Sequence, residues 1–271
     1  MRAYERAKFA LWHQSDLCHD PKGYGKDVRD NLVSGVTLEM IEDDYSHGSG
    51  QELTFKMRAI HSSSALVANT FGRWKTDPTM LELLGHSDFQ PPTLEAQCST
   101  GLRGTPPNID VLLQSSNIVI GVESKLLEPL GAPKKPFFSE SYSRTKLSQC
   151  EDAWWDLLEE VRHWPPSRFD AAQLIKHYLG LRKQFGTGHE ICLVYLYWKP
   201  LNAESIAEYS QHAEDMKKFR SKIPDNGSVQ FIVMDYPGLW ESWLNDSNPT
   251  LANHASILKQ RYCVEIRHHA S

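Results

Sequence analysis

The sequence predicts an α/β fold with a mixed central sheet flanked by helices. The first observation is a pair of apolar runs, IDVLL and IVIGV, on either side of the polar turn QSSN, which is typical of an antiparallel hairpin over residues 108–125. The second is the alternation of helical segments with the apolar strands ICLVYLYW and VQFIVMDY beyond residue 147. Strands that first meander and then alternate with helices indicate a mixed sheet with helical layers.

Length and composition favour one domain over residues 1–271, with an N-terminal helical extension over about 1–50. A chain of 271 residues that is 40% hydrophobic can bury one sizeable core. The net charge of -5 argues against a protein that binds nucleic acid through its overall charge. A local basic groove remains compatible with it.

Five cysteines are scattered without CxxC pairs, and their odd number fits reduced thiols better than a disulfide framework. The N-terminus MRAYERAKFALWHQSD lacks the apolar core of a secretion signal. No apolar run approaches the roughly 18 residues of a membrane span. We therefore expect a cytoplasmic protein that does not contact a membrane.

Helices are expected over residues 1–19 and about 51–70, separated by the loop PKGYGKD. The second helix places Phe55, Leu66 and other apolar side chains on one side. Glu52 lies at its start, where it is either a functional carboxylate or a solvated first-turn glutamate favoured by the helix dipole.

A strand at LEAQCS precedes the hairpin, and an irregular segment over residues 126–146 follows it. That segment carries more basic than acidic side chains, which suits a loop that contacts phosphate groups. Its basic residues are Lys134, Lys135, Arg144 and Lys146.

The last part of the chain is expected to hold helices over 148–163, 170–184 and 203–220, and shorter helices at PGLWESWL and HASILKQRY. The strand ICLVYLYW shows no alternation of polar and apolar residues. It is therefore expected to be buried on both faces of the sheet.

Three charged residues interrupt the apolar hairpin: Asp110, Glu123 and Lys125. If the hairpin closes through the two serines of its turn, Gln114 faces Asn117, and Asp110 faces Gly121. Glu123 then becomes the diagonal neighbour of Asp110 on the same face, roughly 7 to 8 Å away. Lys125 shares that face because strand side chains alternate.

Two carboxylates close together are costly unless a proton or a cation lies between them. Oxygen ligands suit a hard divalent cation, so the expected cofactor is Mg²⁺, with Mn²⁺ as a substitute. The alternative is an ordinary surface salt bridge between Glu123 and Lys125. The apolar flanks of both strands favour an interior site instead.

This pattern resembles the PD-(D/E)xK nuclease superfamily, in which an aspartate near the start of one strand precedes Glu-x-Lys on the next. Here the aspartate lies in PPNID, so the proline is displaced from its usual place. HSSSALVANTFG, GVESKLLEP, DAAQLIKHYLGL and LKQRY are similar to one poorly characterised bacterial group of that superfamily. The resemblance implies a restriction-endonuclease-like three-layer α/β/α core and metal-dependent hydrolysis of phosphodiester bonds.

The resemblance also implies roles for individual residues. Asp110 and Glu123 match the metal-binding carboxylates, and the backbone carbonyl of Ser124 would supply a further ligand. Lys125 matches the lysine that positions or activates the attacking water. Relatives often add a glutamate, for which Glu52 and Glu95 compete, although either could instead be a surface carboxylate.

On the helix over 170–184, Gln173 resembles a glutamine that helps to order the site in exonuclease-like branches. Lys176, one turn on, could contact a phosphate. The alternative for both is the solvated face of an amphipathic helix.

We therefore expect a nuclease whose partner is nucleic acid, with DNA favoured. The same site could act on RNA or on a special nucleic-acid structure, or could have lapsed into a binding scaffold. Cleavage of both strands of a duplex would need two active sites, which makes a homodimer plausible.

Overall fold

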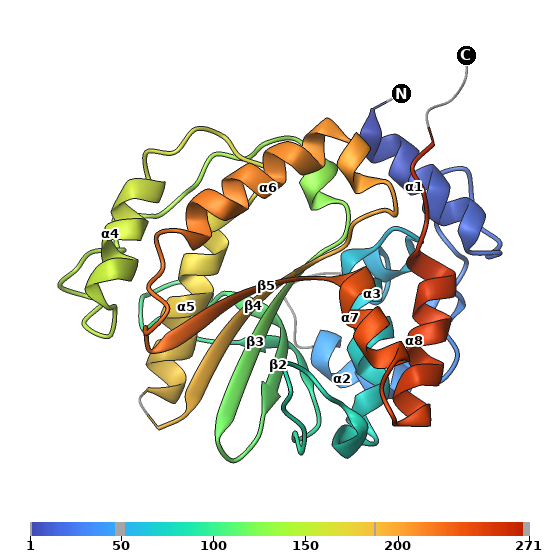
Figure 1. The fold of residues 1–271 in the computed structure, drawn as a ribbon, viewed down its shortest axis with the longest axis horizontal. Helices are drawn as coiled ribbons and strands as arrows, with labels where there is room; N and C mark the ends of the chain where they lie inside the picture. The colour runs from blue at the N-terminus through green and yellow to red at the C-terminus, as the bar shows by residue number, and fades with distance from the viewer. Residues whose placement is uncertain (1, 47–51, 187, 268–271) are drawn as a thin grey trace.

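A five-stranded sheet forms the centre of the structure, a computed structural model that describes residues 2–46, 52–186 and 188–267. The strands lie side by side in chain order, and Figure 1 shows them crossing the middle of the molecule. Their bounds are β1 Thr93–Gln97, β2 Asn108–Gln114, β3 Ile118–Lys125, β4 Glu190–Tyr197 and β5 Val229–Asp235.

The sheet is mixed, as the sequence predicts. β1, β2 and β3 pair antiparallel, whereas β3, β4 and β5 pair parallel. The direction therefore changes at β3, the central strand, which has a hydrogen-bonded neighbour on each side. Residues 191–196 of β4 are all buried, which confirms the burial that its unbroken apolar sequence predicts.

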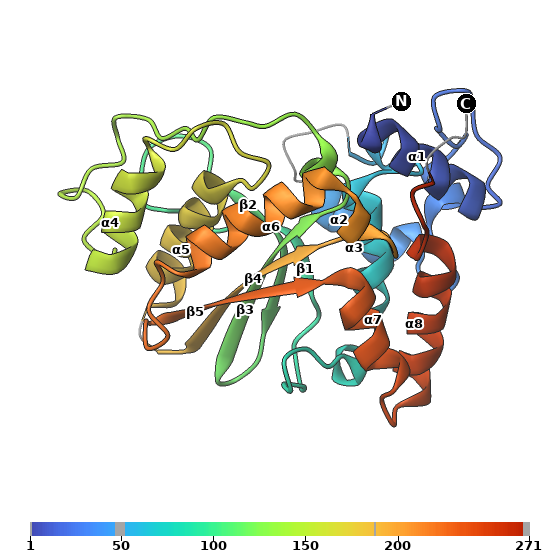
Figure 2. The same ribbon diagram turned by 45° about the horizontal axis from the view of Figure 1, so that its top comes forward.

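Eight helices cover the two faces of the sheet within the described ranges. The bounds are α1 Ala3–Gln14, α2 Leu38–Ser46, α3 Ser63–Phe71, α4 Asp152–Val161, α5 Ala171–Phe185, α6 Ala207–Arg220, α7 Tyr236–Leu244 and α8 Pro249–Tyr262. In Figures 1 and 2, α4, α5 and α6 lie on one face, and the other helices lie on the opposite face.

Each face has its own hydrophobic core. Val122 and Val194 point to the core shared with α1, α3, α7 and α8. Val119 and Leu193, from the same two strands, point to the core shared with α4 and α5. Because strand side chains alternate between faces, the two cores require helices on both sides. This arrangement confirms the three-layer α/β/α architecture.

Two N-terminal helix predictions are wrong in extent. The first helix ends at Gln14, and Asp16 has a φ of 52° just beyond it, a conformation that does not continue a right-handed helix. The helix expected over 51–70 begins only at Ser63, because Ser62 caps it by accepting a hydrogen bond from Ala65 N at 3.2 Å. Residues 47–51 lie outside the described residues.

Helix α5 packs closely on the sheet at two glycines. A Cβ on Gly180 would lie 2.4 Å from the backbone oxygen of Cys98, and a Cβ on Gly121 would lie 2.9 Å from a methyl group of Leu181. The absence of side chains at these glycines brings α5 close to β3. This close packing determines which α5 side chains can reach the charged residues of β3.

The described N-terminal helices pack against the same core as the sheet. Ala7 and Leu11 of α1 and Ile41 of α2 are fully buried there. Asp44 of α2 accepts a hydrogen bond from Leu94 N of β1 at 3.0 Å. In the described part of the chain, no helix has the length and apolarity that a membrane span requires. All five cysteines are free, as predicted.

Candidate active site

The hairpin of β2 and β3 brings the charged residues together in a register that differs from the predicted one. Leu112 faces Gly121 and Gln114 faces Val119, so the prediction that Asp110 faces Gly121 is wrong by two residues. The observed pairs end at Val111 and Val122, and Ile109 packs with Leu112 in the core shared with α5, so strict alternation of faces does not continue through Asp110. Asp110 lies beside the end of β3, where its Oδ2 is 2.6 Å from Ser124 N.

Glu123 is the centre of a buried hydrogen-bond network. Its side chain is 1% exposed, and its Oε1 accepts from the Lys125 ammonium. Its Oε2 is 2.7 Å from His177 Nε2. Lys125 Nζ also donates to Gln173 Oε1 at 3.0 Å. Burial of this network contradicts the alternative of an ordinary surface salt bridge.

The charge on Glu123 is stabilised by these partners. Burial opposes ionisation, but the positive charge of Lys125, together with hydrogen bonds from Lys125 and His177, lowers the pKa of Glu123 to about 2. Burial likewise opposes the charged form of Lys125, yet the carboxylates of Glu123, Glu128 and Asp110 raise the pKa of its ammonium. Glu123 and Lys125 are therefore charged together at neutral pH.

His177 is a site residue that the sequence prediction missed. It follows Gln173 by four residues on α5, so both side chains lie on one face of the helix. That spacing was the available signal, although a buried histidine in an apolar helix gives the same pattern. Its Nδ1 is buried with no hydrogen-bond partner among the described residues.

The negative charge of Asp110 is less well stabilised than that of Glu123. Its Oδ2 accepts a hydrogen bond from Ser124 N at 2.6 Å. Burial and the nearby charge of Glu123 nevertheless raise the pKa of Asp110 well above its usual value. The Ser124 hydroxyl lies 2.7 Å from the Tyr236 hydroxyl, which fixes the side chain of the predicted carbonyl ligand.

Of the two competing glutamates, Glu95 lies near Asp110, and Glu52 lies near Glu95. Glu95 lies between the β1 pairs formed by Leu94 and Ala96, level with Asp110, and has a φ of 52°. Such strained backbone is uncommon in a strand and concentrates at functional sites. Burial raises the pKa of Glu95, as do the charges of Glu52 and Glu123.

Glu52 is the more strongly engaged of the two. It accepts from Lys56 Nζ at 2.6 Å and from Ser64 Oγ, in the first turn of α3, at 2.9 Å. The charge of Glu52 contributes to the raised pKa of Glu95, so the two carboxylates lie near one another. The structure brings Glu95, Asp110 and Glu123 close enough for their charges to interact, with Glu52 next to Glu95.

Comparison with known families adds to this geometry. The family model described as "Restriction Endonuclease associating with ARP" matches residues 6–263. The chain belongs to this restriction endonuclease family. No curated protein and no solved structure matches the chain. Membership supports nuclease activity and a nucleic-acid partner for this chain.

The donor atoms of the candidate site are of the type that a hard cation prefers, but they are not arranged as a complete metal centre. Carboxylate oxygens of Asp110 and Glu95 are the ligand type that Mg²⁺ prefers. Within the described ranges, however, no three Asp, Glu, His or Cys side chains converge closely enough to hold an ion. Both carboxylate oxygens of Glu123 already have a partner, Lys125 at Oε1 and His177 at Oε2, so a cation would have to share one of them.

The predicted phosphate-contacting residues fall into two groups. Lys134, Lys135 and Lys146 are exposed. Arg144 is engaged within the protein, since it donates to Asp152 and to Cys150 O.

Lys176 is also engaged within the protein. Its ammonium lies over the rings of Phe137, Phe138 and Tyr142, 5.5 to 6.0 Å from their centroids. These aromatic contacts attach the loop after β3 to α5.

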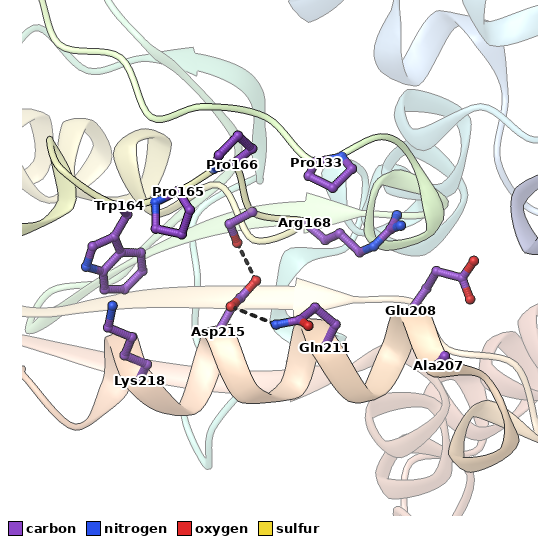
Figure 3. Close-up of a pocket in the computed structure, with 11 residues that line it drawn as sticks. Pro133, Trp164, Pro165, Pro166, Arg168, Ala207, Glu208, Gln211, Asp215 and Lys218 are labelled. Carbon is purple, nitrogen blue, oxygen red and sulfur yellow. Dashed lines mark hydrogen bonds between the residues drawn. The ribbon is translucent and has the colours of Figure 1, made fainter.

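A cavity of about 580 Å³, drawn in Figure 3, lies between α6 and residues 164–168. None of the predicted catalytic residues lines it. Its polar groups bond to one another: Asp215 accepts from Ser167 Oγ at 2.5 Å, and Lys218 lies 4.0 Å above the Trp164 ring. This cavity is therefore separate from the candidate active site.

Proposed function

We propose that this protein is a metal-dependent nuclease of the PD-(D/E)xK type that hydrolyses phosphodiester bonds of DNA. Asp110, Glu123 and Lys125 are the residues on which the proposal depends. Mg²⁺ is the proposed cofactor, and Mn²⁺ is its substitute. Family membership supports the nuclease class, and the charged residues on β2 and β3 support the chemistry.

The observation that carries the proposal is the buried set of charges on the central strands. A buried ion pair contributes little to stability compared with apolar residues of the same size, because both charges must be desolvated. Here the Glu123–Lys125 pair lies beside a second carboxylate, Asp110, whose pKa is strongly raised. Carboxylates whose pKa is strongly shifted, next to a positively charged side chain, are typical of catalytic sites.

Each side chain then has a defined task. Asp110, Glu123 and the Ser124 carbonyl would hold the cation, with Glu95 or Glu52 as a further ligand. When bound, the cation would polarise the phosphoryl oxygen and lower the pKa of a water molecule.

Lys125 orients the attacking water and stabilises the charge that develops on the phosphate. Gln173 holds Lys125 in place through its hydrogen bond of 3.0 Å. His177 fixes the carboxylate plane of Glu123 from the opposite side.

The decisive experiment compares the parent with Lys125→Met on linear and circular, single- and double-stranded DNA and RNA. Each substrate is incubated with Mg²⁺ or Mn²⁺ and, separately, with EDTA. The Met variant should lose cleavage by roughly two orders of magnitude, the scale for removal of one preorganised stabilising group. Lys199→Met is the matched control, because Lys199 pairs with Asp235 at 2.8 Å and is 40% exposed.

Other outcomes would contradict or refine the assignment. Equal cleavage by the parent and Lys125→Met would leave Lys125 a salt-bridge partner only. No cleavage of any substrate would favour the lapsed scaffold, and cleavage of RNA alone would favour the RNA alternative. Circular DNA that stays intact while linear DNA shortens would identify an exonuclease.

The oligomeric state and a protein partner belong to the same proposal. Cleavage of both strands requires two active sites, so we propose a homodimer on duplex DNA. The family description names association with ARP, and we extend this association to the chain. Cleavage assays should therefore be run with and without that partner.

A further inference from the structure

A second cavity, of about 300 Å³, lies between α1, the start of α3 and the loop after β3. Polar side chains from three separate segments of the chain face it. The lining residues used below are Tyr4, His61, Ser63, Glu128 and Lys134. None of them belongs to the predicted catalytic set, and we call this space the Glu128 cavity.

The Glu128 cavity shares a wall with the candidate active site. Glu128 Oε2 accepts a hydrogen bond at 2.7 Å from the amide of Leu126, the residue that follows Lys125. Glu128 Oε1 accepts from Ser63 Oγ at 2.8 Å. The next serine, Ser64, donates to Glu52 at 2.9 Å. The first turn of α3 thus contacts both Glu52 and the cavity.

The cavity offers neutral donors as well as a carboxylate acceptor. His61 Nδ1 accepts a hydrogen bond from Trp12 Nε1 at 3.2 Å, so the ring carries its proton on Nε2. Burial, helped by the positive charge of Lys8, lowers the pKa of His61 to about 4, which leaves the ring neutral at pH 7. Tyr4 adds an aromatic ring and a hydroxyl group.

The positive charge of the cavity comes from Lys134, whose side chain is exposed. Its backbone is fixed by two hydrogen bonds with Ser167, of 2.8 and 2.9 Å. An ammonium beside an aromatic ring, a neutral donor and an acceptor suits a ligand with both a phosphate group and a base.

The size of the cavity limits the ligand. About 300 Å³ is at the small end of the range for ligand sites, too small for a stacked base pair with its backbone. Enzymes that act on a buried nucleotide take it out of the stack into such a pocket. We infer that the Glu128 cavity binds a single nucleotide of the substrate strand, unpaired or at a strand end, next to the phosphate that is cut.

This inference rests on the proposed function, yet it can be tested without cleavage. Binding of a deoxynucleoside monophosphate in EDTA is measured by calorimetry for the parent, Lys134→Ala and His61→Phe. Both variants should bind the nucleotide about tenfold more weakly, the scale of one charge-assisted hydrogen bond. Lys217→Ala is the control, because Lys217 is exposed on α6 and lines neither cavity.

A second measurement locates the nucleotide in a substrate strand. Duplexes that carry 2-aminopurine at successive positions are mixed with the protein in EDTA, and fluorescence reports unstacking of the labelled base. Fluorescence should rise at one position beside the cleavage site, and the rise should be lost in His61→Phe. Addition of the free deoxynucleoside monophosphate should reverse the rise in fluorescence, because it competes for the cavity.

The outcomes separate the two proposals. Cleavage by the parent without nucleotide binding or a fluorescence peak would overturn the cavity inference and leave the nuclease proposal intact. Equal nucleotide binding by the parent and both variants would also overturn the inference. Nucleotide binding that depends on Lys134 and His61 in a protein that cuts no nucleic acid would uphold the cavity and contradict the nuclease.

Discussion

Glu123 has each carboxylate oxygen bonded to a different buried group, Lys125 on one side and His177 on the other. Asp110, on the neighbouring strand, has the amide of Ser124 as its one hydrogen-bond donor among the described residues. Because their surroundings differ, the two carboxylates should respond to substitution in opposite directions, although both are candidate metal ligands.

Glu123→Ala should destabilise the protein by about 3–5 kcal/mol, since the substitution leaves the Lys125 ammonium buried without its counter-ion. Urea unfolding in EDTA measures the change. Glu159→Ala is the matched control, because Glu159 pairs with Arg162 at 2.9 Å with 47% of its side chain exposed. Loss of that surface pair should lower the free energy of unfolding by at most about 1 kcal/mol. Equal losses in the two variants would contradict the buried network.

Asp110→Asn should hold or raise the stability of the metal-free protein at pH 7. The amide keeps an oxygen for Ser124 N and removes a carboxylate whose folded-state pKa is raised above its usual 3.8. The folded parent therefore retains this proton where the unfolded chain has lost it, and loses relative stability as pH rises through the raised pKa.

The advantage of Asp110→Asn should accordingly grow as pH rises from about 4 towards 7. Thermal unfolding in EDTA at several pH values measures it. An advantage that shrinks over this range would contradict the raised pKa of Asp110.

At the scale of elements, α5 positions the site from outside the sheet. The helix contributes Gln173 to Lys125 and His177 to Glu123, and its Gly180 allows it to lie against the backbone of Cys98. The distance between α5 and β3 should therefore control activity as well as stability.

Gly180→Ala tests this dependence. Its Cβ would lie 2.4 Å from Cys98 O, so α5 must move away from the sheet. The variant should lose about 1–3 kcal/mol of stability, the scale of an overpacked core, and should cleave more slowly at temperatures where it is folded. Gly188→Ala, whose nearest atom is 4.0 Å away, is the control. Parent-like cleavage by Gly180→Ala would show that the site tolerates a displaced α5.

The loop after β3 allows a second test at this scale. Replacement of Lys134, Lys135 and Lys146 by alanine should flatten the plot of log affinity for DNA against log salt by about 2–3 units, because each phosphate contact releases counterions. Arg144→Ala should change the slope little, since its guanidinium already bonds to Asp152. An unchanged slope in the triple variant would exclude the loop as a phosphate contact.

The elements also show how far the sequence predicts structure. The alternation in the hairpin predicts that Glu123 and Lys125 share a face of β3, as their contact shows, but not the register against β2, because a shift by two residues preserves every face. The stripe that begins near Phe55 suggested an early helix start, whereas the capping hydrogen bond of Ser62 decides it. Charge patterns revealed Arg144 and Lys176 but not the Asp152 carboxylate and aromatic rings that engage them.

At the scale of the whole molecule, the positions of the strands along the chain and the mixed character of the sheet could be predicted, because burial on one or both faces of a sheet is visible in the residue pattern. The residue pattern does not show which strands lie next to β3 in the sheet. His177 illustrates the limit, since its role arises only when α5 docks on the sheet.

Metal binding should raise the thermal stability of the folded chain. Mg²⁺ should raise the melting temperature of the parent, because a ligand that binds only the folded state stabilises it by about 2.7 kcal/mol at 100 times its Kd. For a chain of this length each kcal/mol is roughly 2–4 °C. The rise should be absent in Asp110→Asn, and an equal rise in both would place the ion elsewhere.

The two-residue bridge between Lys134 and Ser167 joins the loop after β3 to the segment that leads into α5. Its two amides should exchange with solvent deuterium more slowly than the exposed amides around them. The loop then loses its conformational entropy when the chain folds, and not when nucleic acid binds. DNA would meet a rigid surface, and its binding should show a smaller unfavourable entropy than binding to a loop that must first become ordered.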